Sequence, residues 1–493
     1  MRNPRFLPVA LVLAFAATIW LALGSPLAPP ASATAPATTF SAARAMQHVA
    51  VLAQAPRPLA SAANAQARAY LLAQLRALGL EPQVQTTTMQ HNDTDQLANV
   101  HVTLAVVHNI VVRLPGTRPG KALLLASHYD TTPTSPGAAQ GGASSAALLE
   151  TLRALQKSPP LAHDLIVLFA DGQQQYGMGA QAFAEQHPWA RQVGMVLKFD
   201  NAGNRGPLVL YDSAGADGAA IDGWAAHAPA ARGSSLMRAI YPHMPHAVPL
   251  GPLAALHVPM LQFANVEGFT GPQGSGDTAE RLAPSTLQHE GDTMLALARH
   301  FASAPLTPGT PGQVYFTLPH IGVVHYSGSA VWPVTRLACL LLFGVACLGI
   351  QRSSVDAQAL LQGVFGYALI CCAIAAAAYV AWQMLPTHEG YAPLWQGFSE
   401  REWWYQLGCV AFCSAAFIYL QRRLQTSIGV TAAALGALVC IAIGLLAVSY
   451  ALPGASYVLV WPMLSILTAL AVLYWPRAHA WRVWILLAGA TPA

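Results

Sequence analysis

Apolar residues in the middle of the chain recur at the spacing of helices and then of strands. One helical face is marked by Ala43, Met46, Val49 and Leu52. Further helices are predicted at residues 67–78 and 143–155, and β-branched or apolar runs predict strands at 109–114, 122–126 and 165–170. Strands that alternate with helices predict an α/β fold, with a mixed, mainly parallel sheet and helices on both faces. In such sheets, sites form beyond the carboxyl ends of the strands.

The N-terminus has the pattern of a secretory or anchoring segment. Arg2 and Arg5 precede an apolar run over residues 6–23, which is long enough to cross a bilayer. We therefore interpret residues 1–24 as a signal anchor or signal peptide, and the small residues 31–33 leave both open. The Ala/Pro/Thr-rich stretch 25–39 predicts a linker, so the globular domain is expected over residues 40–304.

The C-terminal third is strongly apolar. After a second predicted linker at 305–330, apolar segments of bilayer-spanning length follow at 331–350, 360–385, 403–420, 429–450 and 456–475. They predict an α-helical transmembrane bundle of about five spans over residues 331–493. The spans hold no Asp or Glu, which favours an anchor or platform over an ion pathway.

Charges in the connecting segments indicate the orientation of this bundle. Arginines lie in alternate loops, at Arg352, at Arg422 and Arg423, and at Arg477 and Arg482. The loop 386–402 is instead rich in glutamate. By the positive-inside rule, the arginine loops face the cytoplasm and the middle domain lies outside it. The alanine-rich composition favours the periplasmic face of a bacterial inner membrane.

Composition supports a membrane partner and excludes nucleic acid. The chain is 54% hydrophobic and 9% charged, against roughly 25% charged in soluble domains. Lys and Arg number 25 against 21 Asp and Glu, and no basic stripe with interleaved aromatics is present. All 7 cysteines lie in the apolar C-terminal third, so the middle domain has no disulfide or thiolate metal site.

Four ordered segments carry the candidate chemistry. They are 127–130 (Ser-His-Tyr-Asp) at a strand end, 136–150 opening a helix, 171–174 (Asp-Gly-Gln-Gln) at the next strand end, and 198–201 (Lys-Phe-Asp-Asn). This series resembles the zinc exopeptidases of metallopeptidase family 28, whose members include aminopeptidases and membrane-bound proteases. The resemblance covers about residues 40–304 and is supported by segments 57–61, 109–116 and 277–282. It implies a zinc-exopeptidase-like fold.

The resemblance also implies roles for three retained residues. His128 matches a zinc ligand, Asp130 matches the carboxylate that orients this histidine, and Asp200 matches the carboxylate ligand of a second zinc. Imidazole and carboxylate groups suit zinc, and the metals of such a site acidify a water and polarise the peptide carbonyl.

Glutamine stands at the remaining positions of the family site. The bridging aspartate falls on Gln140, the general base on Gln173, the zinc-binding glutamate on Gln174 and the distal histidine on Gln273. A carboxamide brings no charge and cannot take a proton near neutral pH. We therefore expect zinc to be absent or weakly bound, and the amides to satisfy one another and His128 by hydrogen bonds.

Two histidines, His243 and His246, offer substitute ligands, although their Pro-rich segment lacks a flanking carboxylate. Three functions remain open. The chain is a pseudopeptidase that binds a peptide or a partner protein in its cleft, an active and perhaps single-metal aminopeptidase, or a membrane scaffold. Metal content separates the second from the others, and peptide binding separates the first from the third.

Overall fold

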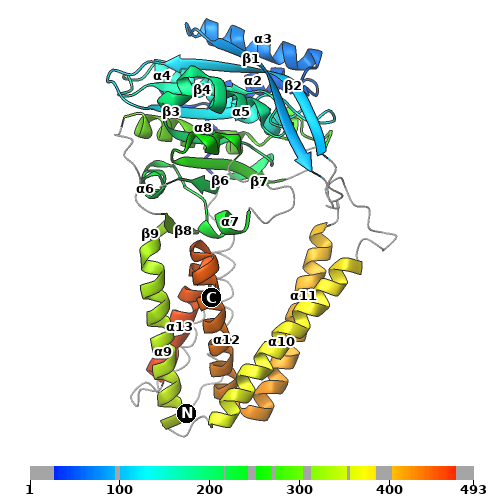
Figure 1. Ribbon diagram of the computed structural model, residues 1–493, viewed down its shortest axis with the longest axis vertical. Coiled ribbons are helices and arrows are strands. Elements are labelled where there is room, and N and C mark those ends of the chain that lie inside the picture. The colour runs from blue at the N-terminus through cyan, green and yellow to red at the C-terminus, as the bar shows by residue number, and fades with distance from the viewer. Residues whose placement is uncertain are drawn as a thin grey trace. The chain divides into compact units, whose positions relative to one another are not determined.

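The computed structural model describes residues 27–94, 100–215, 217–241, 251–268, 274–303, 312–351, 356–384 and 402–473. The chain divides into two compact units (Figure 1). Ser25–Ser327 form one unit, and the C-terminal helices belong to the other. The candidate chemistry lies in the first unit, so its sheet is described first.

A 7-stranded sheet forms the centre of the first unit. In spatial order its strands are β1 (Gln83–Thr94), β2 (Val100–Leu114), β4 (Leu165–Ala170), β3 (Ala122–His128), β5 (Val193–Phe199), β7 (Met260–Glu267) and β6 (Arg205–Ala214). The pairs β3–β4, β3–β5 and β5–β7 are parallel. The outer pairs β1–β2, β2–β4 and β6–β7 are antiparallel. The predicted mixed sheet is confirmed, with its parallel part at the centre.

Helices cover both faces of this sheet, as predicted (Figure 1). Successive residues of β3 alternate between two cores: Leu123 and Leu125 pack in one, and Leu124 and Ala126 in the other. Burial on both faces explains why β4 reads as a continuous apolar run. The helices of this unit are α2 (Ala42–Leu52), α3 (Ala62–Ala77), α4 (Ser144–Gln156), α5 (Met178–Gln186), α6 (Gly218–His227), α7 (Ser235–Ile240) and α8 (Pro284–Phe301).

Some elements extend beyond their predicted limits. Helix α3 begins at Ala62 instead of residue 67, because the Ser61 side chain caps it by accepting a hydrogen bond from the Asn64 backbone N–H. Strand β2 begins at Val100 instead of residue 109, because it pairs with β1 in a long hairpin. Its outer residues Val102 and Leu104 are exposed, so no burial pattern marked them as a strand.

Both segments predicted as linkers contribute to the first unit. In the segment 25–39, the Ala31 backbone N–H donates to Gln288 Oε1 over 2.9 Å, and Arg153 donates to the carbonyl oxygens of Ala37 and Thr39. In the segment 305–330, β8 (Gln313–Leu318) and β9 (Gly322–Ser327) form a hairpin. Its Tyr315 is fully buried and packs edge-on against Trp224, with ring centroids 5.6 Å apart. This contact holds the hairpin on the unit.

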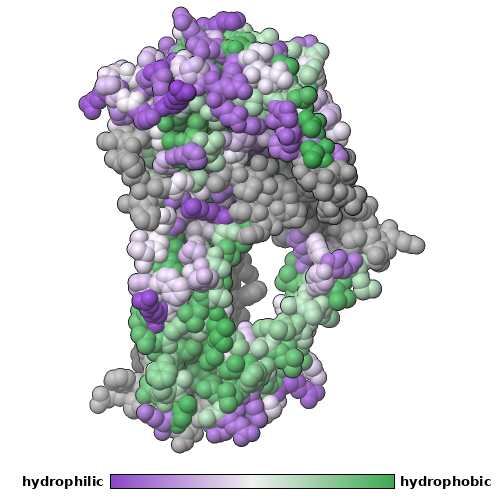
Figure 2. Space-filling model, in the orientation of Figure 1, coloured by the Kyte–Doolittle hydropathy of each residue, from purple (hydrophilic) through white to green (hydrophobic). Residues whose placement is uncertain are grey.

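The second unit contains five helices among its described residues: α9 (Val331–Gln351), α10 (Ala357–Met384), α11 (Glu402–Ile428), α12 (Val430–Ala451) and α13 (Tyr457–Leu473). Three helical stretches, Gly328–Gln351, Ala357–Met384 and Val430–Ala451, are long and apolar enough to cross a membrane. Figure 2 shows hydrophobic residues gathered over the helices of this unit. The predicted N-terminal span at 6–23 lies outside the described residues.

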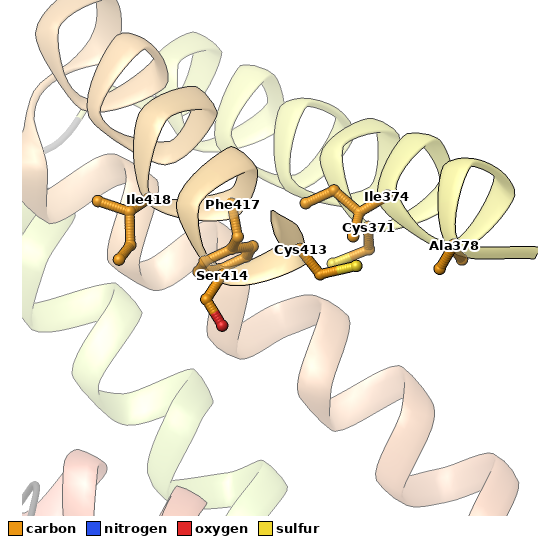
Figure 3. A pocket seen from close by; sticks show the side chains of 8 residues that line it. Cys371, Ile374, Ala378, Cys413, Ser414, Phe417 and Ile418 are labelled. Carbon is orange, nitrogen blue, oxygen red and sulfur yellow. The ribbon is translucent and has the colours of Figure 1, made fainter. Parts of the chain in front are cut away.

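A groove of about 580 Å³ lies between α10 and α11 (Figure 3). Its lining is largely apolar and consists of Cys371, Ile374, Ala375, Ala378, Cys413, Ser414, Phe417 and Ile418. Two thiols and one hydroxyl are its polar groups, and they do not form the set of carboxylates and imidazoles that the sequence predicts for the site.

Candidate functional site

The candidate site lies at the carboxyl ends of the parallel strands. His128 is the last residue of β3, Asp171 follows β4 directly, and Asp200 follows β5 directly. Since β4, β3 and β5 are neighbours in the sheet, these ends meet along one edge. Segments that are more than 70 residues apart in sequence therefore contribute to one site.

His128 is buried and is held at both ring nitrogens. Its Nδ1 lies 3.0 Å from the Asp130 carbonyl oxygen, and because a carbonyl only accepts, Nδ1 carries the proton. Its Nε2 lies 3.2 Å from Asp200 Oδ1, within ion-pair range, although the geometry is too poor for a hydrogen bond. Burial acts to lower the pKa of His128, but the close contacts with the Asp130 and Asp200 carboxylates and their negative charges outweigh it and raise this pKa to about 9. His128 is therefore an imidazolium at neutral pH.

Three nitrogen atoms surround the Asp200 carboxylate. Besides His128, the Gln173 side-chain amide donates to Oδ2 over 2.9 Å, and Lys198 Nζ lies 3.1 Å from the same oxygen. Burial acts to raise the pKa of Asp200, but the charges and hydrogen bonds of Lys198 and His128 outweigh it, and the pKa is well below its usual range. Asp200 is an anion whose two oxygens already face donors.

Asp130 organises the loop that follows β4. Its Oδ1 accepts the backbone N–H of Gln173 over 2.9 Å, and its Oδ2 accepts the backbone N–H of Gln174 over 3.0 Å. Asp130 Oδ1 also lies 3.3 Å from His128 Nδ1. The structure thus places Asp130 beside His128 and makes it the anchor of the glutamine loop.

Gln140 lies in a tight turn that is packed against His128. The next residue, Gly141, has a φ of +77°, and a Cβ there would lie 3.1 Å from His128 Cε1, so the turn requires glycine. The Asp277 carboxylate accepts the backbone N–H groups of Ala139 and Gln140 over 2.8 and 3.0 Å. The turn is therefore fixed independently of any metal.

Among the residues that the structure describes, the expected mutual hydrogen bonding of the amides is not present. Gln173 donates to the Asp200 carboxylate and not to another carboxamide. Gln140 Oε1 is buried, and no partner for it lies among the residues that the structure describes. Gln140 comes from a different loop than Gln173 and Gln174, and sequence spacing does not report the distances between loops. Gln273, His243 and His246 lie outside the described residues.

The site residues that the structure describes do not by themselves fit a two-zinc site. Within the described part of the chain, no group of three or more His, Cys, Asp or Glu side chains is placed to hold a metal ion. His128 Nε2 and Asp200 Oδ1 face each other, and Lys198 brings a positive charge to Asp200 Oδ2. Zinc sites need three or four anionic or imidazole donors, and this arrangement offers two that already pair with each other.

Lys198 is the residue of this site whose role the sequence analysis missed. It lies two positions before Asp200, and residues two apart in a strand point to the same face, so the spacing alone could have paired them. Arg57 was also missed. It is buried and donates to the carbonyl oxygens of Tyr129 and Gly137, which joins the end of β3 to the Gln140 turn.

Comparison with known proteins agrees with the resemblance. The sequence of residues 109–298 matches peptidase family M28. This part of the chain is an M28 domain. It contains His128, Asp130, Gln140, Gln173, Gln174 and Asp200, so the candidate site lies within the domain.

Relatives of the M28 domain include membrane proteases. The chain is 24% identical over 253 residues to endoplasmic reticulum metallopeptidase 1 of Mus musculus, which covers 48% of this chain and 28% of the relative. It is 30% identical over 166 residues to the vacuolar membrane protease of Candida dubliniensis, which covers 32% of this chain and 17% of the relative. The match thus spans less than a third of the length of these relatives.

Among solved structures, the chain is similar to an aminopeptidase from Aneurinibacillus sp. strain AM-1, with a TM-score of 0.44 and 13% identity. The match covers 56% of this chain and 98% of that one.

Proposed function

We propose that this chain is a membrane-anchored M28 homologue that no longer hydrolyses peptides and that binds a peptide or a partner protein through the former cleft. The hydrogen bond from Gln173 Nε2 to Asp200 Oδ2 carries this proposal. Gln173 stands where the resemblance places the general base. Here its side-chain NH₂ group donates a hydrogen bond to a carboxylate. A group that donates in this position cannot take the proton of an attacking water.

Loss of the metals would remove the remaining chemistry. Metals in such a site supply both the activated water and the polarisation of the carbonyl. Three of the positions that the resemblance assigns to metal ligands, Gln140, Gln174 and Gln273, hold neutral carboxamides, which are poor zinc ligands. With the base and the metal ligands both altered, the domain retains the fold without the reactive groups.

An exposed aromatic beside the glutamine loop supports retained binding. Tyr176 is 45% exposed and adopts a φ of 57°, which is unusual for a residue other than glycine. Its ring stacks on His91 of β1, with centroids 3.9 Å apart. An exposed tyrosine that is held by stacking beside the glutamine loop is typical of residues that anchor a ligand.

We also propose that the M28 domain lies outside the cytoplasm, at the periplasmic face of a bacterial inner membrane. The alternating arginine loops and the basic N-terminus support this orientation.

The enzymatic part is tested with the full chain purified in detergent. The protein is incubated with zinc, excess metal is removed, and metal content and cleavage of aminoacyl 4-nitroanilides are measured. We expect no stoichiometric zinc and no turnover. Zinc-dependent cleavage that is abolished by His128→Ala would overturn the proposal in favour of a single-metal aminopeptidase.

The binding part is tested with a library of short peptides that have free N-termini. We expect the full chain to retain a subset of them, and Tyr176→Ala to retain fewer. Val51→Ala, an exposed position on α2, is the matched control. Equal retention by all three proteins would contradict a role for Tyr176, and no retention by any of them would favour the scaffold.

A further inference from the structure

Lys198 occupies an unusual position for a lysine. Its side chain is 9% exposed, and it extends from β5 on the same face of the sheet as Asp200. Lysine is almost never buried to this extent unless it is paired. Its partner is Asp200 Oδ2, 3.1 Å from Nζ.

The carboxylate that Lys198 contacts is the one that matches a metal ligand. Asp200 is the retained carboxylate of the predicted metal site, and its Oδ2 also accepts a hydrogen bond from Gln173 over 2.9 Å. On the other side, Oδ1 lies 3.2 Å from His128 Nε2. Each oxygen therefore already faces at least one nitrogen atom.

We propose that the Lys198 ammonium takes the place of a metal cation at Asp200, so that the site is stabilised by a built-in positive charge. This inference rests on the proposed loss of the zinc site and names the group that compensates for it. The Asp200 side chain is 20% exposed, and a partly buried carboxylate that loses its cation is destabilised because its charge is left uncompensated. The Lys198 ammonium is part of the chain and supplies one positive charge permanently. In an active site the positive charge would come from metal ions that bind from solution.

Charge repulsion opposes the presence of both the Lys198 ammonium and a bound metal cation at Asp200. An ammonium within 3.1 Å of a ligand oxygen would lie close to any dication bound by that oxygen, in a poorly solvated position. Glutamine at positions 140, 173 and 174 fits the same charge balance, since three further carboxylates would add negative charge that the single ammonium of Lys198 could not balance. The replacement of the metal ligands by glutamine and the presence of Lys198 thus contribute to the same charge balance.

The first experiment restores the metal ligands in the full chain. Gln140→Asp, Gln173→Glu, Gln174→Glu and Gln273→His are combined with and without Lys198→Met, and cobalt binding is measured by its absorption spectrum. We expect Lys198→Met to raise the cobalt affinity of the restored chain about 10- to 100-fold, the range typical for groups that touch metal ligands. Lys121→Met, at an exposed lysine, is the matched control and should change nothing. Equal cobalt affinity with and without Lys198 would overturn the inference.

The second experiment uses the natural site, so that it gives an answer even if the restored chain does not fold. Lys198→Met should lower the Tm of the full chain, Lys198→Arg should lower it less, and in an Asp200→Asn background Lys198→Met should have little effect. Additive losses from the two substitutions would contradict the pairing. Stoichiometric zinc in the unmodified chain would instead refute the proposed function, so the two failures are distinguishable.

Discussion

The Gln173 side-chain amide donates a hydrogen bond to Asp200 Oδ2 over 2.9 Å. The two residues come from the loops after β4 and β5, which are 27 residues apart in sequence. In the family resemblance both positions carry carboxylates, one as the general base and the other as a metal ligand. Here the amide and the carboxylate contact each other directly, and this difference determines how the site responds to substitution.

Gln173→Glu, the single reversion to the general base, should destabilise the protein. It would place a second carboxylate against Asp200 without a metal between them, and the repulsion would raise the pKa of the new glutamate. The resulting loss of stability is absent below the ordinary glutamate pKa and grows as the pH rises. We expect a Tm at pH 7 that is several degrees lower than that of the natural chain, and a smaller difference at pH 4.

Gln66→Glu is the matched control, because Gln66 is exposed on α3. It should leave the Tm unchanged at both pH values. A Gln173→Glu chain as stable as the control at pH 7 would show that Gln173 does not face Asp200 as described.

Asp130→Asn should also destabilise the protein, with the loop after β4 as the affected part. The Asp130 carboxylate accepts the backbone N–H groups of both Gln173 and Gln174, and an asparagine would turn an NH₂ toward one of them. An unpaired buried donor and the loss of a buried anion together cost about 2–4 kcal/mol. The measurement is the Tm of the full chain, and Asp222→Asn at an exposed carboxylate is the control. Equal effects of the two substitutions would contradict the anchoring role.

Local spacing could predict where the candidate residues lie along the sheet, but not how their side chains meet. Strands of buried residues end at His128 or directly before Asp171 and Asp200. Neighbouring parallel strands place their carboxyl ends at one edge of a sheet, so no further information is needed to bring these residues near one another. The Lys198–Asp200 pair was within reach of the same reasoning, because the strand period is two. The Gln173–Asp200 bond was not, since it depends on how two loops approach each other.

Two parts of the fold escaped prediction for different physical reasons. The β1–β2 hairpin extends beyond the helices, so its residues lack the one-sided burial that gives a strand its alternating pattern. The β8–β9 hairpin was missed because the Pro/Gly-rich stretch before it suggested a linker. Tyr315 buries its ring against Trp224, a contact between residues 91 positions apart that no local pattern reveals.

Glu290 should make the stability of the chain depend on pH. Burial raises its pKa to about 7, although hydrogen bonds from Ser144 and Asn201 act to lower it. A raised pKa in the folded state means that the stabilising effect is fully present below the unfolded pKa of 4.5 and is lost as the pH rises through about 7. The change is on the order of 3 kcal/mol.

The test compares the Tm of the natural chain and of Glu290→Gln between pH 4 and pH 8. The natural chain should lose stability across this range relative to Glu290→Gln, which carries no titrating group at this position. Glu185→Gln, at an exposed carboxylate on α5, should follow the natural chain. A Glu290→Gln chain with the same pH profile as the natural one would exclude Glu290 as the source.

The last prediction concerns membrane orientation. Arg422 and Arg423 lie at exposed positions near the end of α11, whereas the loop 386–402 carries glutamates, so the positive-inside rule assigns the two regions to opposite sides. Single cysteines are introduced at Ser353 and at Ser399 in a chain whose native cysteines are replaced by serine. Intact cells are then treated with a membrane-impermeant maleimide. We expect labelling at Ser399→Cys, on the side of the M28 domain, and none at Ser353→Cys until the cells are lysed. Because lysis exposes both sides, labelling of both cysteines after lysis confirms that each is reactive. Labelling at Ser353→Cys alone in intact cells would reverse the orientation and place the M28 domain in the cytoplasm.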